Sequence, residues 1–173
     1  MSRHQGVLKL LSGGTITNQA CQLVFGCSTD CLYFTQQTAK EGGIINGQFG
    51  LNINTTNILA AMFISTGQDV GSVAEALWSY LTSELDNDTK DLKLTLYFPS
   101  LPVGTVGGGT GYPAQQAALK LLKCNAPDMK GRLAGIIASF ALALDASTSA
   151  AVANDTFTQS HINLARRKQL EKL

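Results

Sequence analysis

Two side chains that could transfer protons, Asp69 and His161, lie at the ends of apolar segments. The chain has one other histidine, His4, and an imidazole changes its charge near neutral pH, so His161 suits general acid or base catalysis. Asp69 follows Gly67, where a carboxylate can act as a base or can cap the next helix by accepting backbone N–H bonds. A histidine near a helix end can likewise serve only to interact with the helix dipole. Both residues are therefore candidate catalytic groups with a structural alternative.

A glycine-rich segment, residues 103–111, contains the run Gly107, Gly108, Gly109 and Thr110. Such a segment has little intrinsic preference for one conformation, so its surroundings must hold it in place. Glycines let a backbone approach a ligand closely, and they equally allow helices or subunits to pack closely. The segment is a candidate ligand-binding loop, and close packing is the alternative.

The four cysteines, at positions 21, 27, 31 and 124, do not have the spacing of a metal site. They contain no CxxC pair and have no histidine nearby, whereas structural zinc sites draw on closely spaced cysteine and histidine ligands. Cys31 as a nucleophile would need a basic partner, and the sequence supplies none near it. We therefore predict no metal site.

Helical spacing of apolar residues is the commonest pattern in the chain. Ile58, Leu59, Met62 and Phe63 recur on one face, and Gly67 can terminate the helix that carries them. The same pattern, or an Ala-rich apolar composition, predicts helices over residues 56–66, 70–85, 113–124, 131–144 and 145–161.

Strand patterns are fewer. Leu92, Leu94 and Leu96 alternate with polar residues, which predicts a half-buried strand. Residues 6–50 are rich in Gly, Thr, Ser, Gln and Asn, and we predict short strands and turns there. Because helices and strands do not alternate as βαβ units, the pattern indicates an α+β fold.

Composition excludes several classes of protein. The 173 residues fit one domain, and with 14% charged and 45% hydrophobic residues the chain is not disordered. A net charge of +1 offers little to neutralise phosphates, so we expect no nucleic-acid partner. The apolar stretch 133–144 is shorter than the roughly 20 residues of a membrane span, and no signal peptide is evident, so we expect a cytoplasmic protein without a membrane partner. The low charge also favours a homo-oligomer, because part of a weakly charged surface would be buried between copies.

Three segments together resemble the C-terminal part of the catalytic domain of HMG-CoA reductase: Thr66 to Asp69, the loop GTVGGGTGYPAQQAALKLL (Gly104 to Leu122), and Gln159 to His161. The resemblance covers residues 50–168, and it divides the chain into a divergent segment 1–49, a reductase-like domain 50–168 and a tail 169–173. It implies the fold of the reductase large domain, with a helix-rich core and short strands.

The resemblance also implies roles for individual residues. In that family NADPH reduces a CoA thioester in two steps to mevalonate, and the active sites lie between subunits. Asp69 and His161 match the family's catalytic aspartate and histidine, and Asn57 matches an asparagine that contacts substrate. The substrate-binding residues implied by the matching segments are Asn57, Gln68, Gly107, Gly108, Gly109, Thr110 and Ser160.

Other parts of the family pattern have no counterpart in the chain. The family's catalytic glutamate and the DAMGMN-type segment of its NADPH-binding small domain are missing, and Cys31 at best takes the place of the catalytic lysine. Loss of one oxyanion stabiliser alone costs about 3 to 4 kcal/mol. We therefore expect no cofactor and no reduction by this chain alone.

Two kinds of function fit these residues. The first is a repurposed, non-redox enzyme. It would catalyse an isomerisation, elimination or cyclisation of a carbonyl-bearing small metabolite, such as a polyketide or terpenoid intermediate of specialised metabolism. The second is a non-catalytic interaction or regulatory subunit, or one part of a split reductase. Joint retention of Asn57, Asp69 and His161 favours the enzyme, because a scaffold does not need them.

Overall fold

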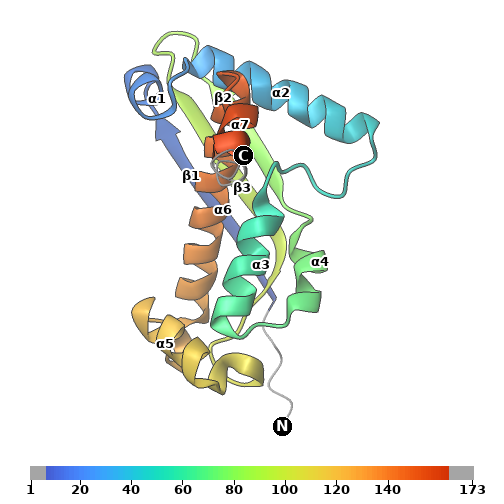
Figure 1. Cartoon of the computed structure of the whole chain (residues 1–173), viewed down its shortest axis with the longest axis vertical. Helices are drawn as coiled ribbons and strands as arrows, with labels where there is room; N and C mark the ends of the chain where they lie inside the picture. Colours follow the sequence, from blue (N-terminus) through green and yellow to red (C-terminus); the bar gives the residue numbers. More distant parts are fainter. Residues whose placement is uncertain (1–6, 164–173) are drawn as a thin grey trace, which may run out of the picture.

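The computed structural model describes residues 7–163. Helices and one small sheet form the chain, in the order β1 (Val7–Ile16), α1 (Asn18–Phe25), α2 (Thr29–Ile45), α3 (Thr55–Thr66), η1 (Val70–Ser72), α4 (Val73–Ala76), β2 (Tyr80–Leu85), β3 (Leu92–Pro102), η2 (Gly108–Gly111), α5 (Pro113–Leu121), η3 (Pro127–Met129), α6 (Lys130–Ala153) and α7 (Phe157–His161). Figure 1 shows α6 running along the sheet, with α5 near one end and α7 beyond the other. The prediction of an α+β, helix-rich fold is confirmed, and its strand content is one small three-stranded sheet.

The sheet is antiparallel with strand order β1-β3-β2. In the first part of β3 every second residue is buried, namely Leu92, Leu94, Leu96 and Phe98. This confirms the strand predicted from their alternation. The helix predicted over 70–85 is wrong beyond α4, because Tyr80–Leu85 pairs with β3 as strand β2, with Leu81 opposite Leu96. Sheet pairing outweighs the helical spacing of the apolar residues there.

The segment expected to form short strands and turns, residues 6–50, forms one long strand and two helices instead. Local capping explains the helices. Thr17 and Ser28 are N-caps whose side chains accept bonds from backbone N–H groups, and Gly26 ends α1 in the left-handed conformation with φ 72°. The polar residues that suggested turns are instead spread over β1, the helix caps, both helices and the loop after α2.

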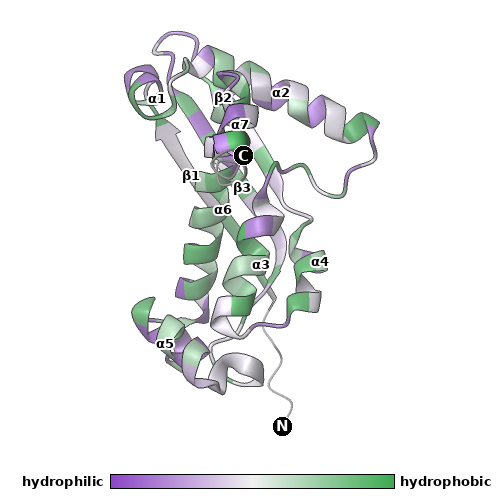
Figure 2. Ribbon diagram, in the orientation of Figure 1, coloured by the Kyte–Doolittle hydropathy of each residue, from purple (hydrophilic) through white to green (hydrophobic). Residues whose placement is uncertain are grey.

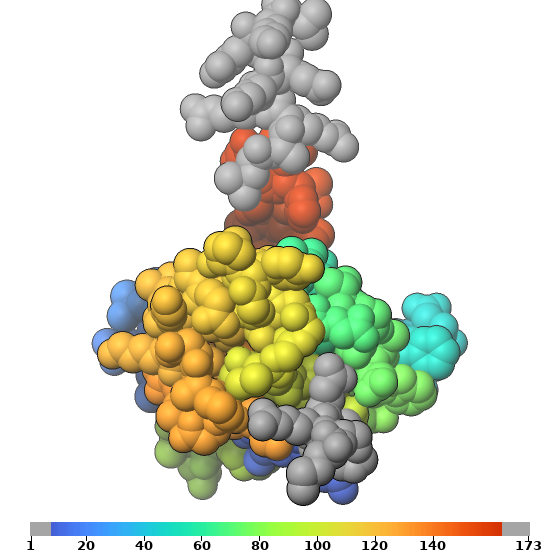
Figure 3. All heavy atoms as spheres, turned by 90° about the horizontal axis from the view of Figure 1, so that it is seen from below, coloured from blue at the N-terminus to red at the C-terminus, as the bar shows by residue number. Residues whose placement is uncertain are grey.

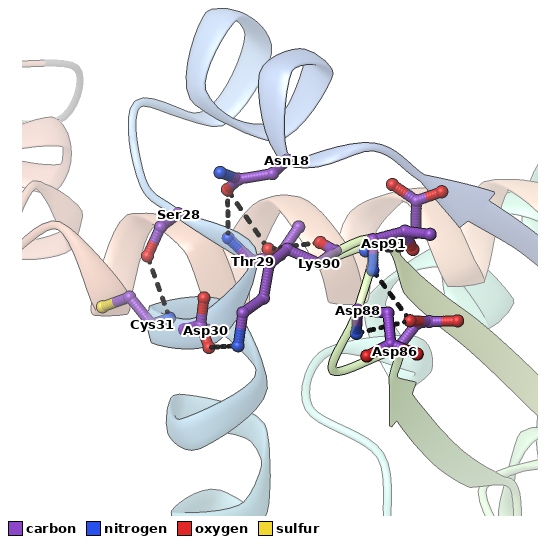
Figure 4. Close-up of polar contacts among 10 residues, drawn as sticks. Asn18, Ser28, Thr29, Asp30, Cys31, Asp86, Asp88, Lys90 and Asp91 are labelled. Atoms are coloured by element: carbon purple, nitrogen blue, oxygen red, sulfur yellow. Dashed lines mark hydrogen bonds and ion pairs between the residues drawn. The ribbon is translucent and has the colours of Figure 1, made fainter.

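The beginning of α2 is fixed to the turn between β2 and β3 (Figure 4). The backbone N–H of Thr29 donates to Asn18 Oδ1 at 3.1 Å, and its hydroxyl donates to the Lys90 carbonyl at 2.7 Å. The Lys90 ammonium lies 3.3 Å from Asp30 Oδ1. Asp86 holds the turn by accepting the N–H of Asp88 at 2.8 Å. These contacts join α2 to the sheet.

Helix α6 is the centre of the core. It packs against α2, α3, β1 and β3, and the main cluster of buried apolar residues includes Leu59, Phe63, Leu96, Phe98, Leu119, Leu133 and Ile137. The two helices predicted over 131–144 and 145–161 are one helix up to Ala153, because Asp145 is accommodated within it by bonds from the start of α3.

With η3, α6 forms a continuous helical stretch of 27 residues with mean hydropathy 1.6 in its most apolar part, where 39% of the residues are buried. By length and composition this stretch could span a membrane. The helix was judged too short for a membrane span because residues 133–144 alone were considered, and that judgement is corrected. The core helix of a soluble protein meets the same criteria. Figure 2 shows that α6 is mostly apolar.

Candidate functional site

The glycine loop and the end of α3 meet backbone to backbone. Gly67 ends α3 with φ 73°, and a Cβ added to it would lie 2.4 Å from the carbonyl carbon of Gly109. A side chain at position 67 would therefore push the loop away. This contact supports the close-packing interpretation of the glycines, and it also leaves backbone rather than side chains facing the space between the two segments.

Gln68 fastens the loop to α3. Its Nε2 donates to the Gly104 carbonyl at 2.9 Å, and its Oε1 accepts the Gly104 N–H at 2.8 Å. The same Nε2 is 3.1 Å from the Thr66 carbonyl. Both the oxygen and the nitrogen of this side-chain amide thus have hydrogen-bond partners within the protein. The structure gives Gln68, predicted to bind substrate, a role in shaping the site.

Asp69 is exposed at the edge of the same site. Its Oδ1 accepts the N–H of Gly71 at 3.0 Å, and its Oδ2 accepts the Ser72 hydroxyl at 3.1 Å. The residue is the N-cap of η1, as the structural alternative predicted. Each carboxylate oxygen keeps a free lone pair, because a carboxylate has about four acceptor sites. Capping fixes the carboxylate and leaves it able to accept a further proton or hydrogen bond.

These segments line an open cavity of about 370 Å³. Its walls are the end of α3, the glycine loop and the start of α5, and they include the predicted residues Gln68, Asp69, Gly107, Gly108, Gly109 and Thr110. Val106 and Tyr112 add apolar surface. The Thr110 hydroxyl is turned inward and donates to the Gly107 carbonyl at 2.6 Å. Six of the nine predicted site residues therefore share one cavity, and Asp69 is the only one of its lining residues that carries a charged side chain.

Asn57 lies in the first turn of α3, at the opposite end of that helix from Asp69. Its side chain is exposed, and its Nδ2 donates to Asn54 Oδ1. It does not line the cavity of Asp69.

Ser160 and His161 lie in α7, which follows the far end of α6 (Figure 1). Both side chains are exposed, and the His161 ring packs edge-on against Phe157 with centroids 4.6 Å apart. Figure 3 shows α7 projecting from the body of the molecule. One chain therefore does not bring Asp69 and His161 together as a proton-transfer pair.

Asp145 is a polar residue that the sequence analysis did not select. It is fully buried in α6, and its carboxylate accepts three bonds from the start of α3. Burial raises the pKa of this carboxyl above its ordinary value, and the backbone bonds from Asn54 and Ile53 partly oppose the rise. A single acidic residue within an otherwise apolar helix was the available signal.

Three cysteines gather near the α1–α2 junction, away from the glycine loop. Burial raises the pKa of the Cys21 thiol to about 12, with the neighbouring Cys27 adding to the rise. Cys31 lies in the first turn of α2, where its sulfur is 3.6 Å from the Ala153 carbonyl. Within residues 7–163 no group of three or more His, Cys, Asp or Glu side chains is arranged to hold a metal.

Comparison with known proteins gives a consistent result. Residues 3–166 match the family described as hydroxymethylglutaryl-coenzyme A reductase, so the match includes most of the segment 1–49 that the sequence analysis set apart. The chain is 37% identical over 123 residues to 3-hydroxy-3-methylglutaryl-coenzyme A reductase of Schistosoma mansoni, covering 71% of this chain and 13% of that protein. It is 37% identical over 132 residues to reductase 1 of Arabidopsis thaliana, covering 72% and 22%.

A similar match is found to a third reductase. The reductase of Aeropyrum pernix is 38% identical over 130 residues, which cover 72% of this chain and 30% of that protein. The chain thus spans less than a third of the length of these curated relatives.

Proposed function

This chain belongs to the hydroxymethylglutaryl-coenzyme A reductase family, and we propose that it is a non-redox enzyme that does acid–base chemistry on a carbonyl-bearing small metabolite. The reaction is an isomerisation, elimination or cyclisation, and the substrate is a polyketide or terpenoid intermediate of specialised metabolism. The proposed location is the cytoplasm. The reaction uses no nicotinamide.

The observation that carries this proposal is the position of Asp69. Its carboxylate is held by Gly71 and Ser72 at the edge of a cavity whose other wall is glycine backbone. A fixed carboxylate can take a proton from the carbon beside a carbonyl group and can return it elsewhere on the same molecule. Backbone N–H groups of the loop are able to stabilise the negative oxygen that forms on the carbonyl.

His161 would join this chemistry from a second copy of the chain. Because α7 and the glycine loop lie at opposite ends of α6 (Figure 1), the pair of Asp69 and His161 can form only between copies. We therefore propose a homo-oligomer in which α7 of one copy reaches the cavity of another. Asn57 and Ser160 are proposed to contact the substrate in this shared site.

The direct test is a metabolite comparison between cells that make the wild-type protein and cells that make Asp69→Asn. The substitution keeps the shape of the side chain and removes its basicity. We expect one precursor to accumulate and a product of equal mass, or of one water less, to fall by at least about 100-fold. Glu75→Gln is the matched control, because Glu75 is an exposed carboxylate of α4 that does not line the cavity. Unchanged metabolites with a folded Asp69→Asn protein would refute the proposal.

A second candidate function, a non-catalytic interaction subunit, is favoured by one observation. Between α5 and the outer side of α6 lies a groove of about 690 Å³, flanked by the exposed side chains Leu121 (84%) and Phe140 (51%). Exposed apolar surface of this kind commonly binds another protein. Phe140→Glu, with sedimentation velocity and the same metabolite comparison, separates the two. Loss of association with unchanged metabolites favours the interaction subunit, and loss of both favours an oligomeric enzyme.

A further inference from the structure

We propose that Asp145 is a positioning residue that sets the orientation of Asn57 by holding the start of α3. The proposal rests on the proposed function in one respect, namely that Asn57 contacts the substrate. Asp145 itself is buried and lines neither the cavity of Asp69 nor the groove beside Phe140.

A single carboxylate takes donors from three consecutive residues. Asp145 Oδ1 accepts the N–H of Asn54 at 2.6 Å. Asp145 Oδ2 accepts the N–H of Ile53 at 3.3 Å and the hydroxyl of Thr55 at 3.0 Å. These three residues are the approach to α3 and its first residue, so α6 fixes where that helix begins.

The side chain of Asn54 transmits this restraint to Asn57. Asn54 is the N-cap of α3, yet its side chain makes no capping bond to the helix. Its Nδ2 donates to the Thr148 hydroxyl of α6 at 3.3 Å, and its Oδ1 accepts from Asn57 Nδ2. Asn57 is exposed, so without this contact its amide would sample several rotamers. The backbone of Asn54 is held by Asp145, and its side chain holds Asn57.

Stability alone does not require a carboxylate at position 145. Within residues 7–163 the ion pairs are Lys90–Asp30 and Lys93–Glu84, so no cation of this part of the chain offsets the buried charge. Burying a carboxylate without a cation is costly, and a local Ser or Asp N-cap would satisfy the start of a helix at lower cost. An acceptor reaching from a neighbouring helix has a different effect, because it fixes α3 relative to α6. We assign Asp145 to that task.

The first test is the side-chain amide spectrum of ¹⁵N-labelled protein. Asp145→Asn is expected to shift the Asn57 and Asn54 NH₂ resonances and to leave those of Gln68 unchanged, because Gln68 is held by the glycine loop. Ser149→Ala is the matched control. Ser149 is buried on α6, and its hydroxyl bonds to the Asp145 carbonyl and to Gln36 but not to α3. An Asn57 resonance that does not move in Asp145→Asn overturns the proposal.

The second test separates positioning from a purely structural role with a double-mutant cycle. The readout is the product-to-precursor ratio in cells making each variant. Asp145→Asn should lower this ratio about 10- to 100-fold in the wild-type background and have no further effect in Asn57→Ala. Equal losses in both backgrounds would overturn the proposal, because Asp145 would then act on stability. If Asn57→Ala leaves the ratio unchanged while Asp69→Asn abolishes product, the substrate role of Asn57 fails and the proposed function stands.

Discussion

At the scale of single residues, Gly67 determines whether the cavity of Asp69 can form. Its left-handed conformation and the 2.4 Å approach of an added Cβ to Gly109 both exclude a side chain. Gly67→Ala should lower the free energy of unfolding by at least about 2 kcal/mol, from backbone strain and displacement of the loop. Urea denaturation measures this. Gly111→Ala is the control, since an added Cβ there meets nothing within 4 Å, and a similar loss in both variants would contradict the close contact.

The candidate site could be predicted from sequence only in part. Asp69 and the glycine loop are adjacent in space, as their joint resemblance to the reductase segments implied. The role of Gln68 was not evident, because a side-chain amide that binds substrate and one that binds the Gly104 backbone look alike in a sequence. The separation of Asp69 from His161 was not evident either, since it follows from the length and direction of α6.

At the scale of elements, Asp145 links the stability of the α3–α6 pair to pH. Burial raises its pKa, so the folded protein keeps this proton at pH values where the unfolded chain, near the ordinary 3.8, has lost it. The contribution of Asp145 to the free energy of unfolding is therefore greatest below the ordinary pKa and declines as the pH rises through the window between the ordinary and the raised pKa.

The comparison of wild type with Asp145→Asn isolates this effect. Urea denaturation of both proteins from pH 4 to pH 7 should show the wild type losing stability relative to the variant as the pH rises through that window. Groups common to both proteins cancel in the difference, including Asp86, whose pKa is lowered by backbone bonds from Thr89 and Asp88. A difference that does not change with pH would mean that Asp145 ionises normally in the folded state.

Pairing and hydrogen bonds between elements explain which helices and strands were predicted wrongly. β3 was evident because its alternation is strict, whereas β2 follows α4 in a continuous pattern of apolar residues and becomes a strand only by pairing with β3. The helices α1 and α2 begin at the caps Thr17 and Ser28, and these local signals could have identified them. The break expected at Asp145 does not occur, because its partners come from a distant segment.

At the scale of the whole molecule, the proposed site needs two copies of the chain. If α7 of one copy supplies His161 to the cavity of another, Asp69→Asn and His161→Ala should each be inactive alone. Mixed under conditions that exchange subunits, they should recover about a quarter of wild-type turnover, because half of randomly paired dimers contain one intact site of two. The assay is product formation from the precursor that accumulates with Asp69→Asn. No recovery in a demonstrated mixed oligomer would contradict a shared site.

The central claim, proton transfer without hydride transfer, is tested most directly in D₂O. Extract from cells making Asp69→Asn, freed of nucleotides, is incubated with purified wild-type protein and analysed by mass spectrometry. The account predicts that the precursor is converted without nicotinamide, either to a product one water lighter or to an isomer in which solvent deuterium replaces one hydrogen at the carbon that receives the returned proton. Conversion only after NADPH is added, with a product heavier by two hydrogens, would contradict it and would make the chain a reductase.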